Sequence, residues 1–482
     1  MMPLKTKVRA GERPRLGRNM KAVQNYHFVG IGGCGMSGLA QVLRKLGHQV
    51  SGTDQQASST LERLCDKGIS VRVGHAAEAV PAELDCLVIS AAVKNDNPEL
   101  VTARQRGVRV LKYAQLLGEL SAQLRTYAIA GTHGKSTTSG WLSFTLHQAG
   151  LDPSFVVGAN VGQLGSGSGA GQGPDLVVEA CEYDRSFLNL RPTAGAILNV
   201  EADHLDYYKD IDEIVRAFSD FAALIAPDGL LVANGADANV SRARAGLGVA
   251  CETFALQGDA DWLPGNLKFE TGQGVFEILY RGQSLGRVKL TLPGTHNVTN
   301  ALAVAALAHH AGAPASAIRL GLENFLGVGR RMSYKGAAGG VVVLDDYAHH
   351  PTEIRVTLEA IRARYQPRRL WCVFQPHQHS RTRFLLQEFA TSFNSADIVL
   401  LPDIYFVRDS ESLRREVSAS QLADLINQRG GRAHYLGDFE NILGRLTGEA
   451  KSGDLVVTMG AGDVWKVGDE FIRRFAGNRQ VG

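Results

Sequence analysis

Cysteine is scarce in this 482-residue chain, and its six cysteines are scattered, with no C-x-x-C pair among them. That spacing argues against a zinc site and a disulfide framework, and it fits a reducing cytosol. Long hydrophobic runs are missing too, since no stretch approaches the roughly 20 apolar residues of a membrane-spanning helix. Charge of one sign does not dominate, because 51 Lys and Arg nearly balance 48 Asp and Glu. We therefore expect a cytoplasmic protein with no nucleic-acid partner and no membrane span.

The overall composition is that of a globular protein, with 44% hydrophobic and 21% charged residues. The length predicts about two to four domains, and we expect a monomer or a weak homodimer. Residues 1–20 stand apart because they are basic and no apolar run follows that would make a secretory signal. We interpret them as a disordered tail or as the result of a misplaced start, with Met20 as the true start.

The segment that says most about chemistry is Gly131-Thr-His-Gly-Lys-Ser-Thr137, which lies between an apolar strand pattern and a helix-like run. The backbone N–H groups of such a Gly-rich loop can hold an anion at a helix N-terminus. Lys135 would reach the β- and γ-phosphates of a nucleotide, and the Ser136 hydroxyl would hold Mg²⁺. Ile129 stands where the general motif has Gly. The segment therefore reads as a shortened P-loop rather than as a Gly-rich turn with an accidental lysine.

A second Gly-rich turn, Gly30-Ile-Gly-Gly-Cys-Gly35, follows a strand pattern at 26–29. A helical pattern over 36–46 and a strand pattern that ends at Asp54 complete a βαβ unit. This arrangement is typical of pyrophosphate binding, with the acid on a ribose. The ligand could be a nicotinamide cofactor or another diphosphate such as a UDP-sugar, and a purely structural turn is the third interpretation.

Two apolar strand patterns after the P-loop end in polar residues. The first ends at Glu179, and the second is followed by Glu201-Ala-Asp-His-Leu-Asp206. Because the carboxyl ends of parallel strands meet at one edge of a sheet, we expect Glu179 and His204 near the P-loop. Glu179 could help to hold Mg²⁺ and, with His204, a second metal, although Mg²⁺ prefers oxygen ligands. The alternative for His204 is a hydrogen bond to a neighbouring ligand residue.

A third α/β run begins with a strand pattern at 341–344. Polar loops follow two of its strands, at 345–353 and at 375–383, and the second loop carries arginines. Arginine is suited to bidentate capture of a carboxylate, so these loops could bind an acid. Taken singly, each could also be a surface loop with satisfied polar groups.

The alternation of strands and helices predicts an α/β protein of three domains. We expect an N-terminal Rossmann-like domain, a central P-loop ATPase-like domain with a mainly parallel sheet, and a C-terminal Rossmann-like domain. The expected boundaries are 1–20 for the tail, 21–124, 125–328 and 329–482. Gly162 to Gly173, rich in Gly and Ser, is predicted to be a mobile loop.

Taken together, the motifs resemble those of the Mur ligase family, and within it the branch that adds L-alanine. The segments that carry the resemblance are His27 to Gly38, Gly131 to Thr137, Glu179-Ala-Cys-Glu182, Asn199 to Asp206, His296-Asn297 with Asn300, Gly329-Arg-Arg331, Asp345 to Glu353, and Phe374-Gln-Pro-His377 with Ser380-Arg-Thr382. The resemblance runs from about Tyr26 to the C-terminal region. It implies a UDP-sugar domain, an ATPase domain and an amino-acid domain, in that order.

Several positions depart from the family pattern. Cys181 stands where Asp is frequent, and a neutral thiol is a poor Mg²⁺ ligand, so we leave it out of the site. Gln378 stands where some relatives carry Arg near the alanine carboxylate, which leaves Arg381 as the main cation there. Glu213 to Asp220 has no lysine that could be carbamoylated, and this favours the alanine-adding branch.

The resemblance also implies roles for individual residues. The ATP-binding residues would be Gly131, Thr132, His133, Gly134, Lys135, Ser136, Thr137, His296, Asn300, Arg331 and Asp346. The UDP-sugar would be bound by Gly30, Gly32, Gly33, Gly35, Met36, Ser37, Asp54 and Ser90. The incoming amino acid would be held by Tyr347, His377 and Arg381, and the metal by Ser136, Glu179 and His204. Lys135, Glu179, His204 and Arg381 would be the catalytic residues.

The implied reaction is the ATP-dependent joining of L-alanine to the carboxylate of UDP-N-acetylmuramate through an acyl phosphate, with Mg²⁺ or alternatively Mn²⁺. His204 or His349 would take the proton from the amine. The alternatives are a ligase that attaches a recycled tripeptide to the same UDP-sugar, a nicotinamide-dependent dehydrogenase built on the first Gly-rich turn, and a UDP-sugar sensor without catalysis. The dehydrogenase leaves the P-loop and Glu179 unexplained.

Overall fold

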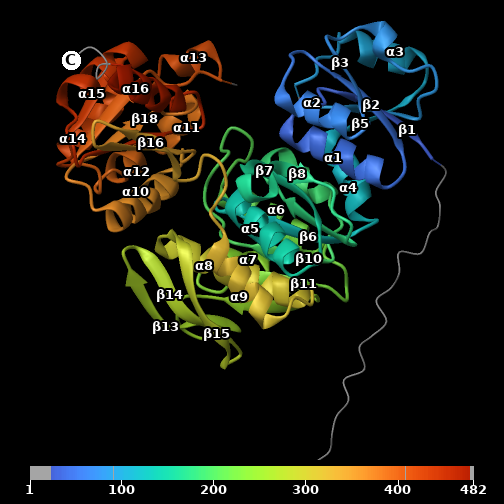
Figure 1. The fold of residues 1–482 in the computed structure, drawn as a ribbon, viewed down its shortest axis with the longest axis horizontal. Helices are drawn as coiled ribbons and strands as arrows, with labels where there is room; N and C mark the ends of the chain where they lie inside the picture. Colours follow the sequence, from blue (N-terminus) through green and yellow to red (C-terminus); the bar gives the residue numbers. More distant parts are fainter. Residues whose placement is uncertain (1–22, 91, 408, 478–482) are drawn as a thin grey trace, which may run out of the picture.

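The computed structural model describes residues 23–477 apart from 91 and 408. The predictions for residues 1–20, including a start at Met20, lie outside the described residues. Three sheets form three lobes (Figure 1), the first in blue, the second in green and yellow, and the third in orange and red. This is the α/β architecture of three domains that the sequence predicts. Within the described ranges, we find no helix with the length and apolarity needed to cross a bilayer.

The N-terminal domain is a five-stranded, wholly parallel sheet in the order β3-β2-β1-β4-β5. Its strands are β1 Asn25–Val29, β2 Gln49–Asp54, β3 Ser70–Val73, β4 Cys86–Ile89 and β5 Arg109–Lys112, and its helices are α1 Cys34–Lys45, α2 Ser59–Asp66, α3 Pro98–Gln105 and α4 Tyr113–Ser121. Every residue of β4 is buried, as expected for a strand covered on both faces. The order places the Gly-rich turn after β1 at the carboxyl edge of the sheet, where β1 lies between β2 and β4.

The central domain has a ten-stranded sheet in the order β15-β14-β13-β12-β11-β10-β6-β9-β7-β8. The strands are β6 Arg125–Ala130, β7 Ser154–Val161, β8 Ser166–Gly169, β9 Asp175–Glu179, β10 Ala194–Ile197, β11 Leu230–Asn234, β12 Ala250–Phe254, β13 Trp262–Glu270, β14 Gln273–Tyr280 and β15 Gln283–Pro293. The helices are α5 Lys135–Gln148, α6 Ile211–Ala222, α7 Ala238–Ala243, α8 Thr295–His310 and α9 Ala315–Asn324. Strands β6, β9 and β10 are parallel neighbours, so the P-loop, Glu179 and the segment after β10 follow adjacent strand ends.

One prediction for this domain is wrong. The Gly/Ser-rich stretch expected to be a mobile loop contains a short helical turn (Gly162–Leu164) and the strand β8, which pairs antiparallel with β7. The β8 sequence, Ser-Gly-Ser-Gly, has no apolar alternation. Its position is determined instead by pairing with β7 and by packing against α1. An added Cβ at Gly38 of α1 would lie 2.5 Å from the Ser168 Cβ. Small residues on both sides thus let the N-terminal domain approach the central sheet closely.

This close approach gives a first testable prediction. Gly38→Leu should destabilise the packing of α1 on β8 by about 1–3 kcal/mol, because the larger side chain has no space there. We expect a lower midpoint in a urea unfolding experiment and weaker UDP-sugar binding. The matched control is Gly444→Leu in α15 (Phe439–Glu449), where no atom lies within 4 Å of an added Cβ. Equal midpoints for the two variants would contradict the prediction.

The C-terminal domain has a six-stranded sheet in the order β16-β17-β21-β18-β19-β20, parallel except for β16. Its strands are β16 Ser333–Ala338, β17 Val341–Asp346, β18 Leu370–Phe374, β19 Ile398–Pro402, β20 Ala433–Gly437 and β21 Leu455–Met459. Its helices are α10 Pro351–Tyr365, α11 His379–Phe384, α12 Leu386–Thr391, α13 Glu411–Arg414, α14 Ala419–Gln428, α15 and α16 Trp465–Gly477. Both predicted polar segments lie at the carboxyl edge of this sheet, but they are shorter as loops than expected. The first includes the end of β17 and the start of α10, and the second follows β18 and runs into α11.

Candidate active site

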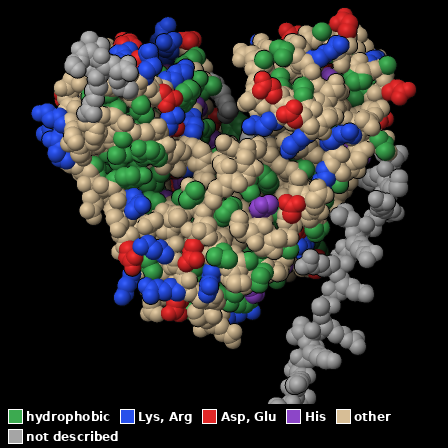
Figure 2. Space-filling view, viewed as in Figure 1, with side chains coloured by type: hydrophobic (Ala, Val, Ile, Leu, Met, Phe, Trp, Pro, Cys, Tyr) green, Lys and Arg blue, Asp and Glu red, His purple; other side chains and the backbone are tan. Residues whose placement is uncertain are grey.

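Two cavities lie at the junction of the domains. One of about 720 Å³ is lined by the central and C-terminal domains and includes His296, and we call it the His296 cavity. The other, of about 820 Å³, is lined by all three domains and includes Lys135, and we call it the Lys135 cavity. The space-filling view shows the hollow between the N-terminal and C-terminal domains (Figure 2). Arg331 and Glu353 line both cavities, so the two sites are connected through these residues.

The P-loop contributes residues to the lining of both cavities. Gly134 has φ +83° and caps the N-terminus of α5, and an added Cβ there would lie 3.0 Å from the Asn300 Oδ1. Glycine is needed at this position for both reasons. The Lys135 Nζ donates to the carbonyl oxygens of Gly131 at 2.6 Å and Thr132 at 3.0 Å. The lysine is thereby folded back over the loop, with its charge at the N-terminus of α5.

Lys135 has a carboxylate partner that the sequence analysis did not assign. Its Nζ donates to the Glu182 Oε1 at 3.0 Å, and the His204 Nε2 lies 3.6 Å from the same oxygen. Burial alone would lower the pKa of Lys135, but Glu182 outweighs it and the pKa is raised. Burial would raise the pKa of Glu182, yet Lys135 and His204 lower it. Lys135 and Glu182 are therefore a buried ion pair beside the P-loop.

The predicted metal ligands converge on one space. Ser136, Glu179 and His204 all line the Lys135 cavity. One oxygen of Glu179, Oε2, accepts the N–H of Gly158 at 2.7 Å, which orients the carboxylate. Hydroxyl and carboxylate oxygens are the donors that Mg²⁺ prefers. The donor set therefore fits Mg²⁺ at Ser136 and Glu179, with His204 beside them.

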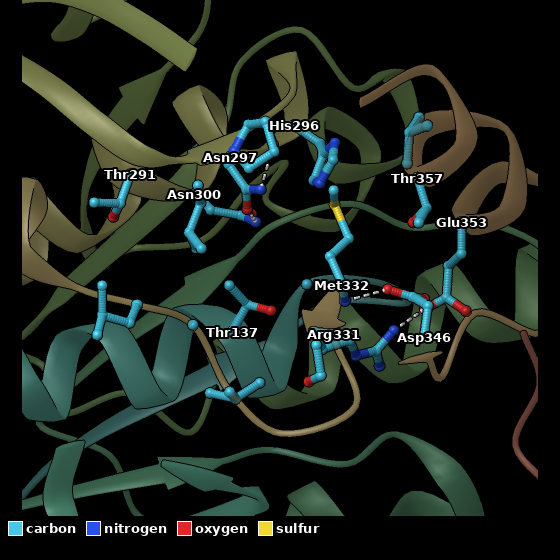
Figure 3. Close-up of a pocket in the computed structure, with 18 of the residues that line it drawn as sticks. Thr137, Thr291, His296, Asn297, Asn300, Arg331, Met332, Asp346, Glu353 and Thr357 are labelled. Carbon is cyan, nitrogen blue, oxygen red and sulfur yellow. Dashed lines mark hydrogen bonds and ion pairs between the residues drawn. The ribbon is translucent and has the colours of Figure 1, made fainter. Parts of the chain in front are cut away.

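The His296 cavity gathers the other predicted nucleotide ligands (Figure 3). His296 and Asn300 come from α8, while Arg331 and Asp346 come from the C-terminal domain. Burial, together with the charge of Arg331, lowers the pKa of His296 to about 4, so its ring is neutral at pH 7. Neutral imidazole and amide groups can exchange hydrogen bonds with a nucleobase. This cavity is therefore suited to the uncharged end of a nucleotide.

Asp346 differs from the other acids of the site. Its oxygens accept the N–H groups of Met332 and Ala348, both at 2.7 Å. Burial nevertheless raises its pKa to about 6, because desolvation outweighs the attraction of Arg331. The carboxylate lines the His296 cavity while its bonds hold the strand end in place. Its contact with the ribose of a nucleotide stays a prediction.

The predicted amino-acid residues lie on the C-terminal side of the Lys135 cavity. Tyr347, His377 and Arg381 all line it. Arg381 is not a free cation, since its Nε donates to the Asp203 Oδ1 at 3.0 Å and both side chains are buried. Burial would raise the pKa of Asp203, but Arg381 lowers it. The guanidinium is thus oriented by an acid from the central domain.

The predicted UDP-sugar residues are only partly brought to the cavity. Gly32 and Ser37 line it, together with Thr60 and Arg63 of α2. The other predicted residues are not among its lining residues: Gly30, Gly33, Gly35, Met36, Asp54 and Ser90. The Asp54 Oδ2 accepts the N–H of Gly32 at 2.8 Å, so this acid caps the turn in the present structure.

Comparison with known proteins agrees with this three-domain arrangement. The models of the Mur ligase family catalytic domain, the Mur ligase middle domain and the Mur ligase glutamate ligase domain match residues 25–125, 129–308 and 330–462. The chain belongs to the Mur ligase family.

Individual relatives are more specific. UDP-N-acetylmuramate–L-alanine ligase of Acetivibrio thermocellus is 41% identical over 93% of this chain and 96% of its own. The ligase of the same name from Trichlorobacter lovleyi is 42% identical over 94% and 99%. Among solved structures, UDP-N-acetylmuramate-alanine ligase of Thermotoga maritima has a TM-score of 0.76 at 26% identity, covering 94% of this chain and 100% of that chain. A murein peptide ligase of Psychrobacter arcticus has a TM-score of 0.68 at 26% identity, covering 94% and 98%.

Sequence reasoning missed the acids that hold the site of this Mur ligase together. Glu182, Asp203 and Glu353 are all buried, and each pairs with a cationic residue. All three stand inside segments that carry the family resemblance, and that position was the available signal. The cationic partners of Glu182, Asp203 and Glu353 could not be read from the sequence, because they lie 47, 178 and 22 residues away.

Within residues 23–477, leaving aside 91 and 408, one group of three side chains could bring metal-ligating atoms together. His133, Glu201 and His350 have ligand atoms within 4.8 Å of one another. However, Thr352 already donates its hydroxyl to the Glu201 Oε2 at 2.6 Å and its backbone N–H to the His350 Nδ1 at 3.3 Å. Thr352 thus engages the Glu201 Oε2 and the His350 Nδ1, while the buried His133 Nε2 makes no hydrogen bond. With two of the three side chains already bonded to the protein, we assign no metal to this Mur ligase at that place.

Proposed function

We propose that this Mur ligase joins L-alanine to UDP-N-acetylmuramate at the expense of ATP, forming ADP and phosphate. The observation that carries the proposal is the Lys135 cavity, because it is lined by the P-loop, by the N-terminal Gly-rich turn and by the arginine of the C-terminal domain. A ligase with three substrates needs such a meeting point. The names of relatives at 41% and 42% identity support alanine as the amine.

The residues of the cavity account for the first step. The carboxylate of UDP-N-acetylmuramate attacks the γ-phosphate of ATP, giving an acyl phosphate and ADP. Lys135 offsets the negative charge as the two anions approach, and Arg331 does so from the C-terminal side. Glu182 keeps Lys135 charged and in place. Mg²⁺, for which Mn²⁺ is an alternative, would be held by Ser136, Glu179 and His204 and would supply further charge neutralisation on the phosphates.

The second step requires a bound amine. The carboxylate of alanine pairs with Arg381, beside Tyr347 and His377. The amine attacks the acyl carbon, its proton passes to His204 or His349, and phosphate leaves. Burial lowers the pKa of His349 to about 3, which keeps its ring neutral but also makes it a weak base for this proton. Docking of the C-terminal domain keeps water from the acyl phosphate.

Product assays test this proposal directly. We expect continuous ADP release from purified protein with Mg-ATP only when both UDP-N-acetylmuramate and L-alanine are present, because the first step alone gives at most one ADP per enzyme molecule. Release that needs the tripeptide instead of alanine would assign the chain to the recycling branch, for which the likeness to a murein peptide ligase gives a specific reason to test. No release in any mixture, from protein shown to be folded, would contradict the proposed function and favour a UDP-sugar sensor.

Two accompanying proposals concern the setting of the reaction. We propose a cytoplasmic location, since the reaction consumes ATP and the chain has scattered cysteines. We also propose that the protein acts as a monomer or a weak homodimer, because a single chain supplies residues of all three domains to the Lys135 cavity. Membership of a ligase family sets aside the dehydrogenase alternative.

A further inference from the structure

The P-loop histidine, His133, makes side-chain contacts that nucleotide binding does not explain. Its backbone N–H donates to the Asn199 Oδ1 at 2.8 Å, which fixes the loop. Its imidazole turns to the domain boundary, where Nδ1 lies 3.4 Å from the Glu353 Oε1 and Nε2 lies 3.6 Å from the Glu201 Oε2. Glu353 belongs to the C-terminal domain and Glu201 to the central domain. The ring therefore lies between two acids from different domains.

These contacts extend into a chain of alternating charge, which we call the His133 chain and define as Arg331, Glu353, His133 and Glu201. The Arg331 Nη1 donates to the Glu353 Oε1 at 3.2 Å. With the ring protonated, two positive and two negative groups alternate, and the formal charge sums to zero. Arg331 lines both cavities. The chain thus links the phosphate side of the site to the P-loop across the domain boundary.

Neighbouring contacts reinforce the same boundary. The Thr352 hydroxyl donates to the Glu201 Oε2 at 2.6 Å, and the His350 Nε2 lies 3.3 Å from the carbonyl oxygen of Ala202. His350 also faces His133, with ring centroids 4.5 Å apart. Both contacts join the N-terminus of α10 to the segment after β10. Glu201 is therefore shared between a neutral contact, Thr352, and a charged contact, His133.

We propose that the His133 side chain is a positioning residue, whose protonated ring joins Glu201 to Glu353 and thereby holds the C-terminal domain and Arg331 in register with the P-loop. The proposal deepens the proposed function and rests on it. The argument for this role is charge balance. A neutral residue at position 133 leaves Glu201 and Glu353 facing each other across the domain boundary, and Arg331 is then the one cation left in the His133 chain. An uncompensated charge at a buried boundary is far costlier than a missing pair.

Charge balance also supplies the experiment. His133→Gln gives the His133 chain a net charge of −1, Glu201→Gln gives +1, and the double variant returns it to zero. We expect His133→Gln to raise the KM for alanine at least 10-fold, because the residues proposed to bind the substrate alanine lie on the C-terminal domain. The double variant should recover at least 5-fold of that loss. Binding of UDP-N-acetylmuramate in the absence of ATP should stay within 2-fold for all three variants, since neither Glu201 nor His133 lines the Lys135 cavity to which the N-terminal domain contributes.

A structural readout separates this inference from the proposed function. Small-angle X-ray scattering should give a larger radius of gyration for His133→Gln than for wild type, and a value near wild type for the double variant. An unchanged radius together with an unchanged KM for alanine would overturn the inference, and so would losses that simply add in the double variant. Failure of the proposed function would show instead as wild-type protein that releases no ADP with alanine and UDP-N-acetylmuramate.

The pH dependence of the radius gives an independent check. Burial would lower the pKa of His133, but Glu201 and Glu353 raise it to about 9. The groups that face the ring are these two acids and His350, whose own pKa is lowered by burial and by His133. Because the pKa lies above its ordinary value, the contribution to docking is complete below about pH 6.5 and is lost as the pH rises through about 9. Wild type should therefore open above about pH 9, whereas His133→Gln should show no such transition.

Discussion

Lys135→Ala is expected to abolish ADP formation, lowering kcat by about 10³-fold or more. Removing one preorganised charge-stabilising group typically costs about 10²–10³-fold, and here the lost group is the P-loop cation that meets two approaching anions. UDP-N-acetylmuramate should still bind, because its predicted residues lie on the N-terminal domain. The measurements are ADP release under saturating substrates and UDP-sugar binding by calorimetry. Turnover like that of wild type would contradict the assigned role.

Stability needs a separate control, because Lys135 is also the partner of a buried acid. Lys135→Ala leaves the Glu182 carboxylate, which is 3% exposed, without its cation. Breaking such a pair costs about 3–5 kcal/mol. The double variant Lys135→Ala/Glu182→Gln removes both charges and should regain most of the lost stability without regaining activity. Lys289→Ala, at an exposed pair with Glu270, should change neither quantity.

The strand-and-helix order was predictable because local patterns determine it. Buried parallel strands such as β4, β18 and β21 read as short apolar runs, and their polar ends mark the carboxyl edge of each sheet. The P-loop was predictable for the same reason, since its residues are contiguous. The convergence of Glu179, His204 and Lys135 then follows from the parallel order of β6, β9 and β10.

What could not be predicted depends on contacts between distant segments. β8 has the composition of a loop, and it becomes a strand because β7 pairs with it and α1 covers it. The turn glycines show a related limit. Gly35 was assigned to UDP-sugar binding, but an added Cβ there would lie 2.6 Å from the Tyr113 ring. Its small size is therefore explained by packing, and binding at this position stays a prediction.

The acids of the site show a third limit. Asp203 stands beside the predicted metal ligand His204 and was given no role of its own, and the structure pairs it with Arg381 of the C-terminal domain. No local pattern encodes this pair, because its members belong to different sheets and meet only when the domains dock. The charge available to a bound amino acid is thereby set by tertiary structure.

Arg381→Ala is expected to raise the KM for alanine about 100-fold or more. The change removes the cation proposed to bind the alanine carboxylate and leaves Asp203 buried without its partner, and truncating one member of a buried charge pair costs about 2–5 kcal/mol. Arg381→Lys keeps the charge but not the planar Nε–H that Asp203 accepts, so it should give an intermediate KM. The measurement is initial rate against alanine concentration at saturating ATP and UDP-N-acetylmuramate.

The partial reaction separates alanine binding from a general loss of the site. In the proposed mechanism the acyl phosphate forms in a first step that does not involve the amine, so trapping it with hydroxylamine should give similar amounts of hydroxamate in wild type and Arg381→Ala. Asp203→Asn provides the matched test, because it leaves the Arg381 guanidinium charged but no longer fixed through Nε. If orientation matters as well as charge, Asp203→Asn should raise the KM for alanine about 10-fold while the KM for ATP stays within about 3-fold. Equal losses in hydroxamate formation and in alanine-dependent turnover would instead place Arg381 in the phosphoryl-transfer step.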